Sequence, residues 1–422
     1  MKRTLGFCVA ILATTSFAIA GGNGDDKKGD KKKGGAKKEA ATPTVDGWSG
    51  GPGKGLTYSS DAFGLTLRSR GQVAFNYNDN DAVSDTVGFN VRRARTSLSG
   101  HLWNEDTTYK LQTDWTEGTS IKDLYIDWRF HNTESYDMGL RVGQQKIAFG
   151  NDWKTSSGEL EFVDRGLATR TFSNSRSRGA TLHGDMGMGS DGGNFGWSFS
   201  AFNSELAAAA ANSGEEGDPR GGAVNDNLDD AWNYNAEVHW SSKAKADLGT
   251  SQGDNHDGQS AFGAGLSFYH GNGRVLAGTP AAGTDVETDS LNANASWRSG
   301  GGIAVSGEYF TRSESVSGGA GDNDSSGFQV ACTWVAAPNP GQNQWGAGLR
   351  YSAVDVDAGQ ILLTGGLVGA GGDATELEAV VNMFHHGHNL KTQFGVTLQE
   401  IDMTGGGSMD NVLLSIQNTF VF

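Results

Sequence analysis

The chain has 422 residues and a formal net charge of −16 at neutral pH, with 64 glycines and two cysteines. This cysteine count excludes a disulfide-stapled fold, because Cys8 lies in the N-terminal leader and Cys332 is then left without a partner. With this acidic balance we expect no nucleic-acid partner.

Residues 1–20 have the pattern of a secretory signal peptide, in which two basic residues precede an apolar run from Leu5 to Ile19. Residues 21–55 are rich in Lys and Gly and have almost nothing to bury, so they are expected to form a disordered periplasmic tether. Its lysines could contact an anionic cell-wall polymer, although a solvated tether is the plainer interpretation. Beyond the leader, no apolar run approaches the roughly 18 residues that a spanning helix needs.

The stretch from Phe89 to Gly150 contains four consecutive segments in which polar and apolar residues alternate, joined by polar turns. In one of them Leu124 and Ile126 share one face, while Asp123 and Asp127 share the other. Period-two alternation of this kind predicts a β-meander in which each strand has one apolar and one strongly polar face.

Two features indicate that the apolar face meets lipid. Trp103, Trp128 and Phe130 stand where an apolar face ends at a tight turn, as an interfacial aromatic girdle requires. The polar face carries Arg and Lys well inside the strands, where a water-filled lumen can solvate them. Residues 56–422 are therefore predicted to form an all-β domain, a transmembrane antiparallel β-barrel.

Alternation along the rest of the chain gives about sixteen strands, with fourteen or eighteen as alternatives. An even number places both termini at the periplasmic side, and sixteen strands leave an aqueous channel. Short connections are interpreted as periplasmic turns and long ones as extracellular loops. The connection Ser241–Ser260 is expected on the periplasmic side, yet it is too long for this pattern. The predicted strands are 63–77, 91–102, 109–115, 123–130, 138–145, 178–184, 195–203, 231–240, 261–269, 290–297, 302–311, 327–335, 344–352, 375–384, 389–399 and 411–422.

Several motifs stand out between Phe63 and Gly179: RRARxSLxG, YKLxxDW, IKDLYIDW, RVGQQKIAFG and EFVDR. This stretch resembles the phosphate-selective outer-membrane porins, a family of anion and pyrophosphate channels of Gram-negative bacteria. The resemblance implies a passive channel in the lipid of the bacterial outer membrane, without a cofactor, assembled as a homotrimer. It also implies a loop that folds into the lumen and sets the constriction. The terminal Phe422 matches the aromatic ending of such barrels.

Five arginines face inward by strand parity and are the candidate anion-binding residues of the pore wall. Strands about 4.8 Å apart bring such side chains into a cluster, and guanidinium groups bind phosphate oxygens in pairs. These arginines are Arg68, Arg70, Arg93, Arg95 and Arg141.

Residues 146–177 resemble the constriction loop, and their mixture of charges facing a basic wall predicts a transverse field. The charged residues of this loop are Lys146, Asp152, Lys154, Glu159, Glu161, Asp164, Arg165, Arg170 and Arg176.

Four acidic residues are expected to face the lumen opposite the arginines: Glu237, Glu308, Glu376 and Glu378. A general diffusion pore for small hydrophilic solutes therefore fits the pattern as well as an anion- or phosphate-selective pore. A structural barrel that anchors the envelope through its tether is a further alternative.

An enzyme is not expected. The inward-facing His101 and His239 have no serine partner in a recognisable motif. The turn with His385, His386 and His388 has no carboxylate in its motif, so these histidines are interpreted as interfacial polar residues and no metal site is predicted.

Overall fold

The computed structural model describes residues 47–81, 84–116, 120–173, 176–187, 193–203, 205–207, 232–243, 252–254, 256–275, 285–317, 322–357, 371–404 and 406–422. The predicted signal peptide, most of the predicted tether and much of the long loops lie outside these residues. Their assignments stay predictions.

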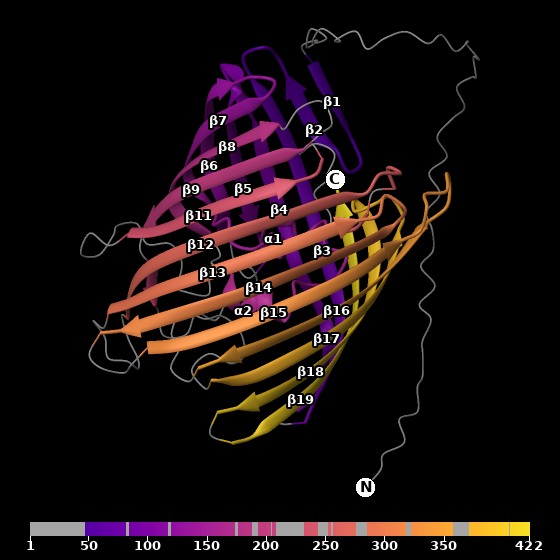
Figure 1. Ribbon diagram of the computed structural model, residues 1–422. Helices are drawn as coiled ribbons and strands as arrows, with labels where there is room; N and C mark the ends of the chain where they lie inside the picture. Colours follow the sequence, from indigo (N-terminus) through magenta and orange to yellow (C-terminus); the bar gives the residue numbers. More distant parts are fainter. Residues whose placement is uncertain are drawn as a thin grey trace. The chain divides into compact units, whose positions relative to one another are not determined.

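Sixteen strands in the described part of the chain form one closed antiparallel ring (Figure 1). Each strand pairs with the next, and the last pairs with the first, so the predicted β-barrel of sixteen strands is confirmed. Each predicted strand overlaps one strand of the ring. The ring consists of β3 (Gly64–Asn80), β4 (Thr86–Leu102), β5 (Asn104–Asp114), β6 (Ser120–Asn132), β7 (Tyr136–Lys146), β8 (Arg176–Gly187), β9 (Asn194–Asn203), β11 (Trp232–Ser241), β12 (Ala261–Val275), β13 (Asp285–Arg298), β14 (Ile303–Val316), β15 (Asp322–Val335), β16 (Gln344–Val356), β17 (Gly372–Phe384), β18 (Leu390–Met403) and β19 (Ser408–Val421).

Three further strands lie outside the ring: β1 (Gly47–Gly51), β2 (Gly55–Ser59) and the short β10 (Glu205–Ala207). β1 and β2 form a hairpin, and β2 pairs with the first residues of β3. The hairpin corrects the expected boundary at residue 55. Backbone pairing, which the low apolar content of this stretch does not reveal, already begins at Gly47.

The seam of the ring lies between β3 and β19. Gly71 stands opposite Phe420, and a Cβ atom at Gly71 would lie 2.2 Å from the phenyl ring. The seam continues to the last residue, because Phe422 and Ser69 exchange backbone hydrogen bonds of 2.9 and 2.7 Å. A glycine is required here because the ring of Phe420 occupies the space of a side chain.

The two faces of the wall have opposite chemistry, as the alternation predicts. Leu124 and Ile126 are about half exposed, with 50% and 48% of their surface accessible, whereas Asp123 and Asp127 are buried on the lumen side. Exposed large apolar side chains recur on every strand of the ring except β5, where Tyr109 and Leu111 are partly buried, and they form the surface that meets lipid.

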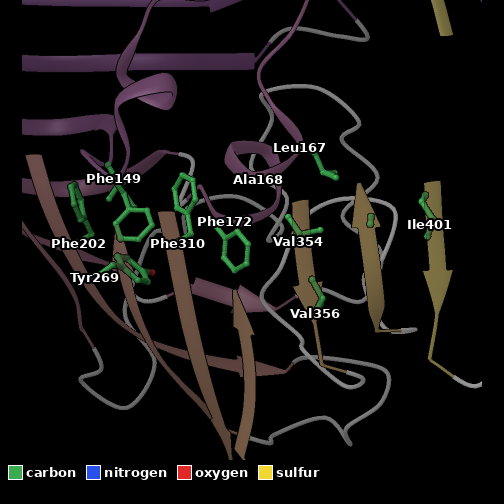
Figure 2. Packing of buried hydrophobic residues seen from close by; sticks show 12 residues of the cluster. Phe149, Leu167, Ala168, Phe172, Phe202, Tyr269, Phe310, Val354, Val356 and Ile401 are labelled. Atoms are coloured by element: carbon green, nitrogen blue, oxygen red, sulfur yellow. The ribbon is translucent and has the colours of Figure 1, made fainter. Parts of the chain in front are cut away.

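The largest buried apolar cluster lies inside the ring, where the segment between β7 and β8 packs against the wall (Figure 2). This segment carries two short helices, α1 (Asn151–Lys154) and α2 (Leu167–Phe172). Phe172 stacks on Phe310 of β14 with ring centroids 5.6 Å apart, and Phe149 contacts the same ring. The core therefore anchors a loop to the inner surface of the wall.

No helix in the described residues has the length and apolar character to cross a membrane.

Candidate functional site: the constriction zone

The segment between β7 and β8, here called the constriction loop, hydrogen-bonds through its backbone to acidic residues on the opposite wall. The Glu308 carboxylate accepts the N–H groups of Asn151 at 3.1 Å and Asp152 at 2.5 Å. Farther along the loop, Glu378 accepts the Val163 N–H at 3.3 Å and Glu376 the Leu167 N–H at 3.2 Å. These wall glutamates lie on the lumen side, as parity predicts, but the loop covers them.

Ion pairs strengthen the same contacts. Arg170 of the loop pairs with Glu376, and Lys154 pairs with Glu237 on β11. The two glutamates are buried while Arg170 and Lys154 are partly exposed, so water competes for these pairs less than for pairs on a protein surface. The negative charge of this wall is thus largely neutralised by the loop.

Three cations of the wall hold the loop by its carbonyl groups, and none of them was among the predicted site residues. Arg312 donates to the Phe172 carbonyl at 2.9 Å, Arg350 to the Asp164 carbonyl at 2.9 Å, and Lys391 to the Leu160 carbonyl at 2.5 Å. Each is buried. Strand parity places all three on the lumen side, so alternation was a signal that could have found them.

Arg93 and Arg95 lie inside the barrel, but both are buried and engaged by protein groups. Arg95 pairs with Asp114 at 2.6 Å and donates to the Ser157 hydroxyl at 3.1 Å. Arg93 donates to the Gln72 side-chain oxygen at 2.8 Å. The constriction loop covers Arg93, whose guanidinium lies 3.7 Å from Asp164 of the loop, whereas Arg95 is buried but still borders the lumen.

A β-bulge turns a third arginine of β4 inward. The register between β3 and β4 shifts so that Gln72 faces Arg93 while Val73 faces Val91, which leaves Arg92 as the extra residue. Arg92 then forms an ion pair with Asp164 of the loop. Burial opposes ionisation of Asp164, but the charges of Arg92 and Arg93 outweigh it and hold the pKa of this carboxyl well below its usual range.

A cavity of about 190 Å³ lies between the loop and strands β3 to β8. Seven basic residues and one acidic residue, Asp123, line it. Lys110 and Arg141 reach it with about a third of their side chains exposed, while Arg176 is buried against Asp123 at 2.8 Å. Of the predicted residues, Arg70, Arg95, Arg141, Lys146, Lys154 and Arg176 thus meet at one cavity.

The same loop separates this cavity from a more evenly charged one. A cavity of about 440 Å³ on the far side is lined by Lys154, Arg298, Arg350 and three carboxylates. A third cavity, of about 480 Å³, adjoins Arg68, Arg70 and Glu159 near the chain's C-terminal rim. Residues 154–159 border all three, so this stretch is the partition of the lumen.

Two predicted loop residues, Arg165 and Glu161, contact protein groups away from the basic cavity. Arg165 donates to the carbonyl groups of Asp152 at 3.2 Å and Thr155 at 2.6 Å, and its guanidinium lies 4.7 Å from the centre of the Trp153 ring. Glu161 lies 3.3 Å from the His388 ring nitrogen. Neither residue is among those that line the basic cavity.

Within the described residues, His270, Glu287 and Asp289 are the group close enough to hold a metal ion, with ligand atoms within 4.8 Å of one another. Both ring nitrogens of His270 already have hydrogen-bond partners. One contacts Asp289 at 2.9 Å and the other contacts Asn272 at 3.3 Å. The three residues lie on β12 and β13, away from the constriction loop.

Known porins have the same barrel fold as this chain. Residues 63–251 match the family model "Phosphate-selective porin O and P". No curated protein sequence matches the chain. Among solved structures, OmpT of Vibrio cholerae is 12% identical with a TM-score of 0.52, covering 87% of this chain and 100% of its own. An anion-selective porin from Comamonas acidovorans is 13% identical with a TM-score of 0.52, covering 85% and 100%. The channel DcaP of Acinetobacter baumannii is 12% identical with a TM-score of 0.52, covering 86% and 98%.

At these identities the solved structures establish the fold, and the family match covers the strands that carry the basic cavity and the constriction loop. The chain is therefore an outer-membrane porin, a passive diffusion channel, whose residues 63–251 match the phosphate-selective porin O and P family.

Proposed function

We propose that this porin conducts anions in preference to cations, with inorganic phosphate among its solutes. The observation that carries the proposal is the 190 Å³ cavity, in which seven basic residues face one acidic residue. A cation-lined passage lowers the free energy of an anion that enters it and raises that of a cation. Low-dielectric walls strengthen this effect, because they focus the field of the lining charges.

The contacts of the wall glutamates support an anion-selective pore over a general diffusion pore. Acidic residues opposite the arginines would attract cations if water reached them. Glu237, Glu308 and Glu376 instead accept hydrogen bonds or ion pairs from the constriction loop. The basic cavity itself keeps more lining cations than carboxylates, although Arg95, Lys110 and Arg141 pair with aspartates of the wall.

Guanidinium and ammonium groups also suit phosphate. Lys110 and Arg141 are partly exposed and combine a mobile point charge with a planar pair of donors, and both kinds of group bind phosphate oxygens. The anion-selective porin from Comamonas acidovorans, which has the same fold, supports the general choice of anions.

The proposed assembly is a homotrimer. A solved structure of OmpT, described as a trimer form, has the same fold, with 12% identity and a TM-score of 0.51 over 86% of this chain and 100% of its own. Chemical cross-linking of the purified porin in detergent tests this state, and a single band at the monomer size would contradict it.

Reversal potentials in a planar bilayer under a KCl gradient test the selectivity, and added phosphate then tests for block of the chloride current. We expect anion selectivity and block, both weakened by Lys110→Ala and by Arg141→Ala. Arg129→Ala is the matched control, because Arg129 is exposed at the end of β6 and lines none of the three cavities. Cation selectivity, or weak selectivity without block, would leave a general diffusion porin.

A further inference from the structure

The connection between β11 and β12 lies at the rim where β19 ends, since both β11 and β19 run toward that rim. This is the connection whose length the strand pattern does not explain. Its described residues are 242–243, 252–254 and 256–260. Residues 252–254, here called the inner brace, contact the constriction loop inside the barrel.

The inner brace is anchored to two neighbouring turns. The Asp254 carboxylate accepts the Gly300 N–H at 2.6 Å and the Ser299 hydroxyl at 3.2 Å, both in the turn between β13 and β14. His256 contacts the Val335 carbonyl at 2.7 Å through its ring nitrogen. His256 also has a φ of +56°, a left-handed conformation that residues with side chains rarely adopt. Asp254 and His256 are therefore both held against neighbouring parts of this rim.

From this anchored position Gln252 bonds to two separate points of the constriction loop. Its side-chain oxygen accepts the Glu161 N–H at 2.9 Å, and its side-chain NH₂ donates to Asp152 Oδ1 at 2.5 Å. The next residue, Gly253, is buried, and a Cβ atom there would lie 2.4 Å from the Glu161 carboxylate. Only a residue without a side chain lets the backbone approach this closely.

The two bonded points enclose the partition of the lumen. Asp152 precedes residues 154–159 and Glu161 follows them, so one amide group ties both ends of the stretch that borders all three cavities. Asp152 is also a junction within the loop, because its second oxygen accepts the Gly166 N–H and the Gln329 side-chain NH₂, each at 3.2 Å. A displacement of Gln252 would therefore displace residues 154–159 through these two bonds.

We infer that Gln252 is a positioning residue for permeation, which holds the partition 154–159 in place from the expected periplasmic rim. The inner brace keeps the basic cavity and the 440 Å³ cavity separate by restraining both ends of the stretch between them. This role rests on the porin activity alone and does not depend on which ion the pore prefers.

Single-channel recording of Gln252→Ala in planar bilayers tests the inference. We expect increased open-channel noise and a broader distribution of conductance levels, together with a reversal potential shifted toward zero in a KCl gradient. Thermal unfolding of the detergent-solubilised barrel, followed by circular dichroism, should stay at the wild-type temperature, because the sixteen-strand ring does not use this contact. A merely structural role would lower that temperature and leave the noise unchanged.

Gln259→Ala is the matched control, since Gln259 is exposed in the same connection and, within the described residues, forms hydrogen bonds through its backbone alone. It should match the wild type in noise, conductance and reversal potential. The double variant D152N/Q252E reverses donor and acceptor at the central bond, and it should return the noise of Q252E toward the wild-type level.

Wild-type noise and reversal potential in Gln252→Ala would overturn the inference, and so would equal effects of Gln252→Ala and Gln259→Ala. A pore that lacks anion selectivity but becomes noisy in Gln252→Ala would uphold the brace while overturning the proposed selectivity. The two proposals are thus separable in one set of recordings.

Discussion

The Glu308 carboxylate accepts the backbone N–H of Asp152 at 2.5 Å, so a residue of β14 holds the first turn of α1 from across the lumen. This contact shows how the acidic wall is used. Its negative charge meets the N–H groups and cations of the constriction loop, and the proposed solute passage lies along the basic wall on the other side.

Replacement of Glu308 by Ala should loosen the start of the constriction loop. Two backbone N–H groups, those of Asn151 and Asp152, would lose their acceptor, at a cost of about 1–3 kcal/mol for each that stays buried. Hydrogen exchange of these two amides in the folded porin should become faster. Glu400→Ala, at an exposed position of β18, should leave both rates unchanged; equal acceleration in the two variants would contradict this assignment.

The stack of Phe310 on Phe172 predicts a second means of releasing the loop. Phe310→Ala removes a fully buried ring, which typically costs about 3–5 kcal/mol. We expect faster hydrogen exchange throughout α2 and proteolytic cleavage of the loop in an otherwise folded barrel. The neighbouring Tyr309 points to the lipid side with 49% of its surface exposed, so Tyr309→Ala should not expose the loop. Loop protection that survives Phe310→Ala would show that polar contacts alone hold α2.

Ionic strength should change the proposed selectivity. Screening lengths fall from roughly 10 Å at 0.1 M salt to roughly 3 Å at 1 M, and the lining cations act on a passing ion through water. The anion-to-cation permeability ratio should therefore decrease as both KCl solutions of a fixed gradient ratio are made more concentrated. A ratio that does not vary with salt would point to steric selection instead of the basic wall.

The pairing of Asp164 with Arg92 should persist in mild acid. The folded-state pKa of Asp164 lies below that of the unfolded chain, about 3.9, so the contact is fully stabilising above the unfolded value and is lost only as pH falls through the folded one. Channel noise that arises from this contact should be the same at pH 7 and pH 4.5. Asp164→Asn removes the charge at every pH and should be noisier at both. A wild-type channel that resembles Asp164→Asn at pH 4.5 would contradict the lowered pKa.

The barrel was predictable from the sequence because one local property, alternation, reports both the strand and the face of each residue. Asp123 and Leu124 are neighbours in the chain, yet one is buried in the lumen and the other half exposed on the outer surface. The lumen-facing position of Glu308 and Glu376 followed from the same rule. Side chains of a strand point alternately to its two faces, so the requirement that one face meets lipid fixes the orientation of every residue in that strand.

Alternation does not predict where a β-bulge interrupts the strand pattern. It also does not predict which residues far apart in the chain are in contact. The bulge at Arg92 shifts the pattern by one residue, so the sequence indicated two inward arginines on β4 where the structure has three. The partners of the constriction loop lie far along the chain, as Gln252 does from Asp152, and no local pattern encodes such pairs. The burial of Arg93 could not be predicted for the same reason, because the loop that covers it could not be placed.

The pairing of β3 with β19, with Phe420 seated over Gly71, also has a consequence for biogenesis. Residues 70–80 of β3 keep an unpaired hydrogen-bonding edge until β19, the last strand of the chain, has been synthesised and can pair with them. An unpaired strand edge is a template for aggregation, so the nascent chain depends on protection during that interval. A larger residue at Gly71 would displace Phe420 and prolong the wait, lowering the yield of inserted barrels while the channels that do close conduct normally.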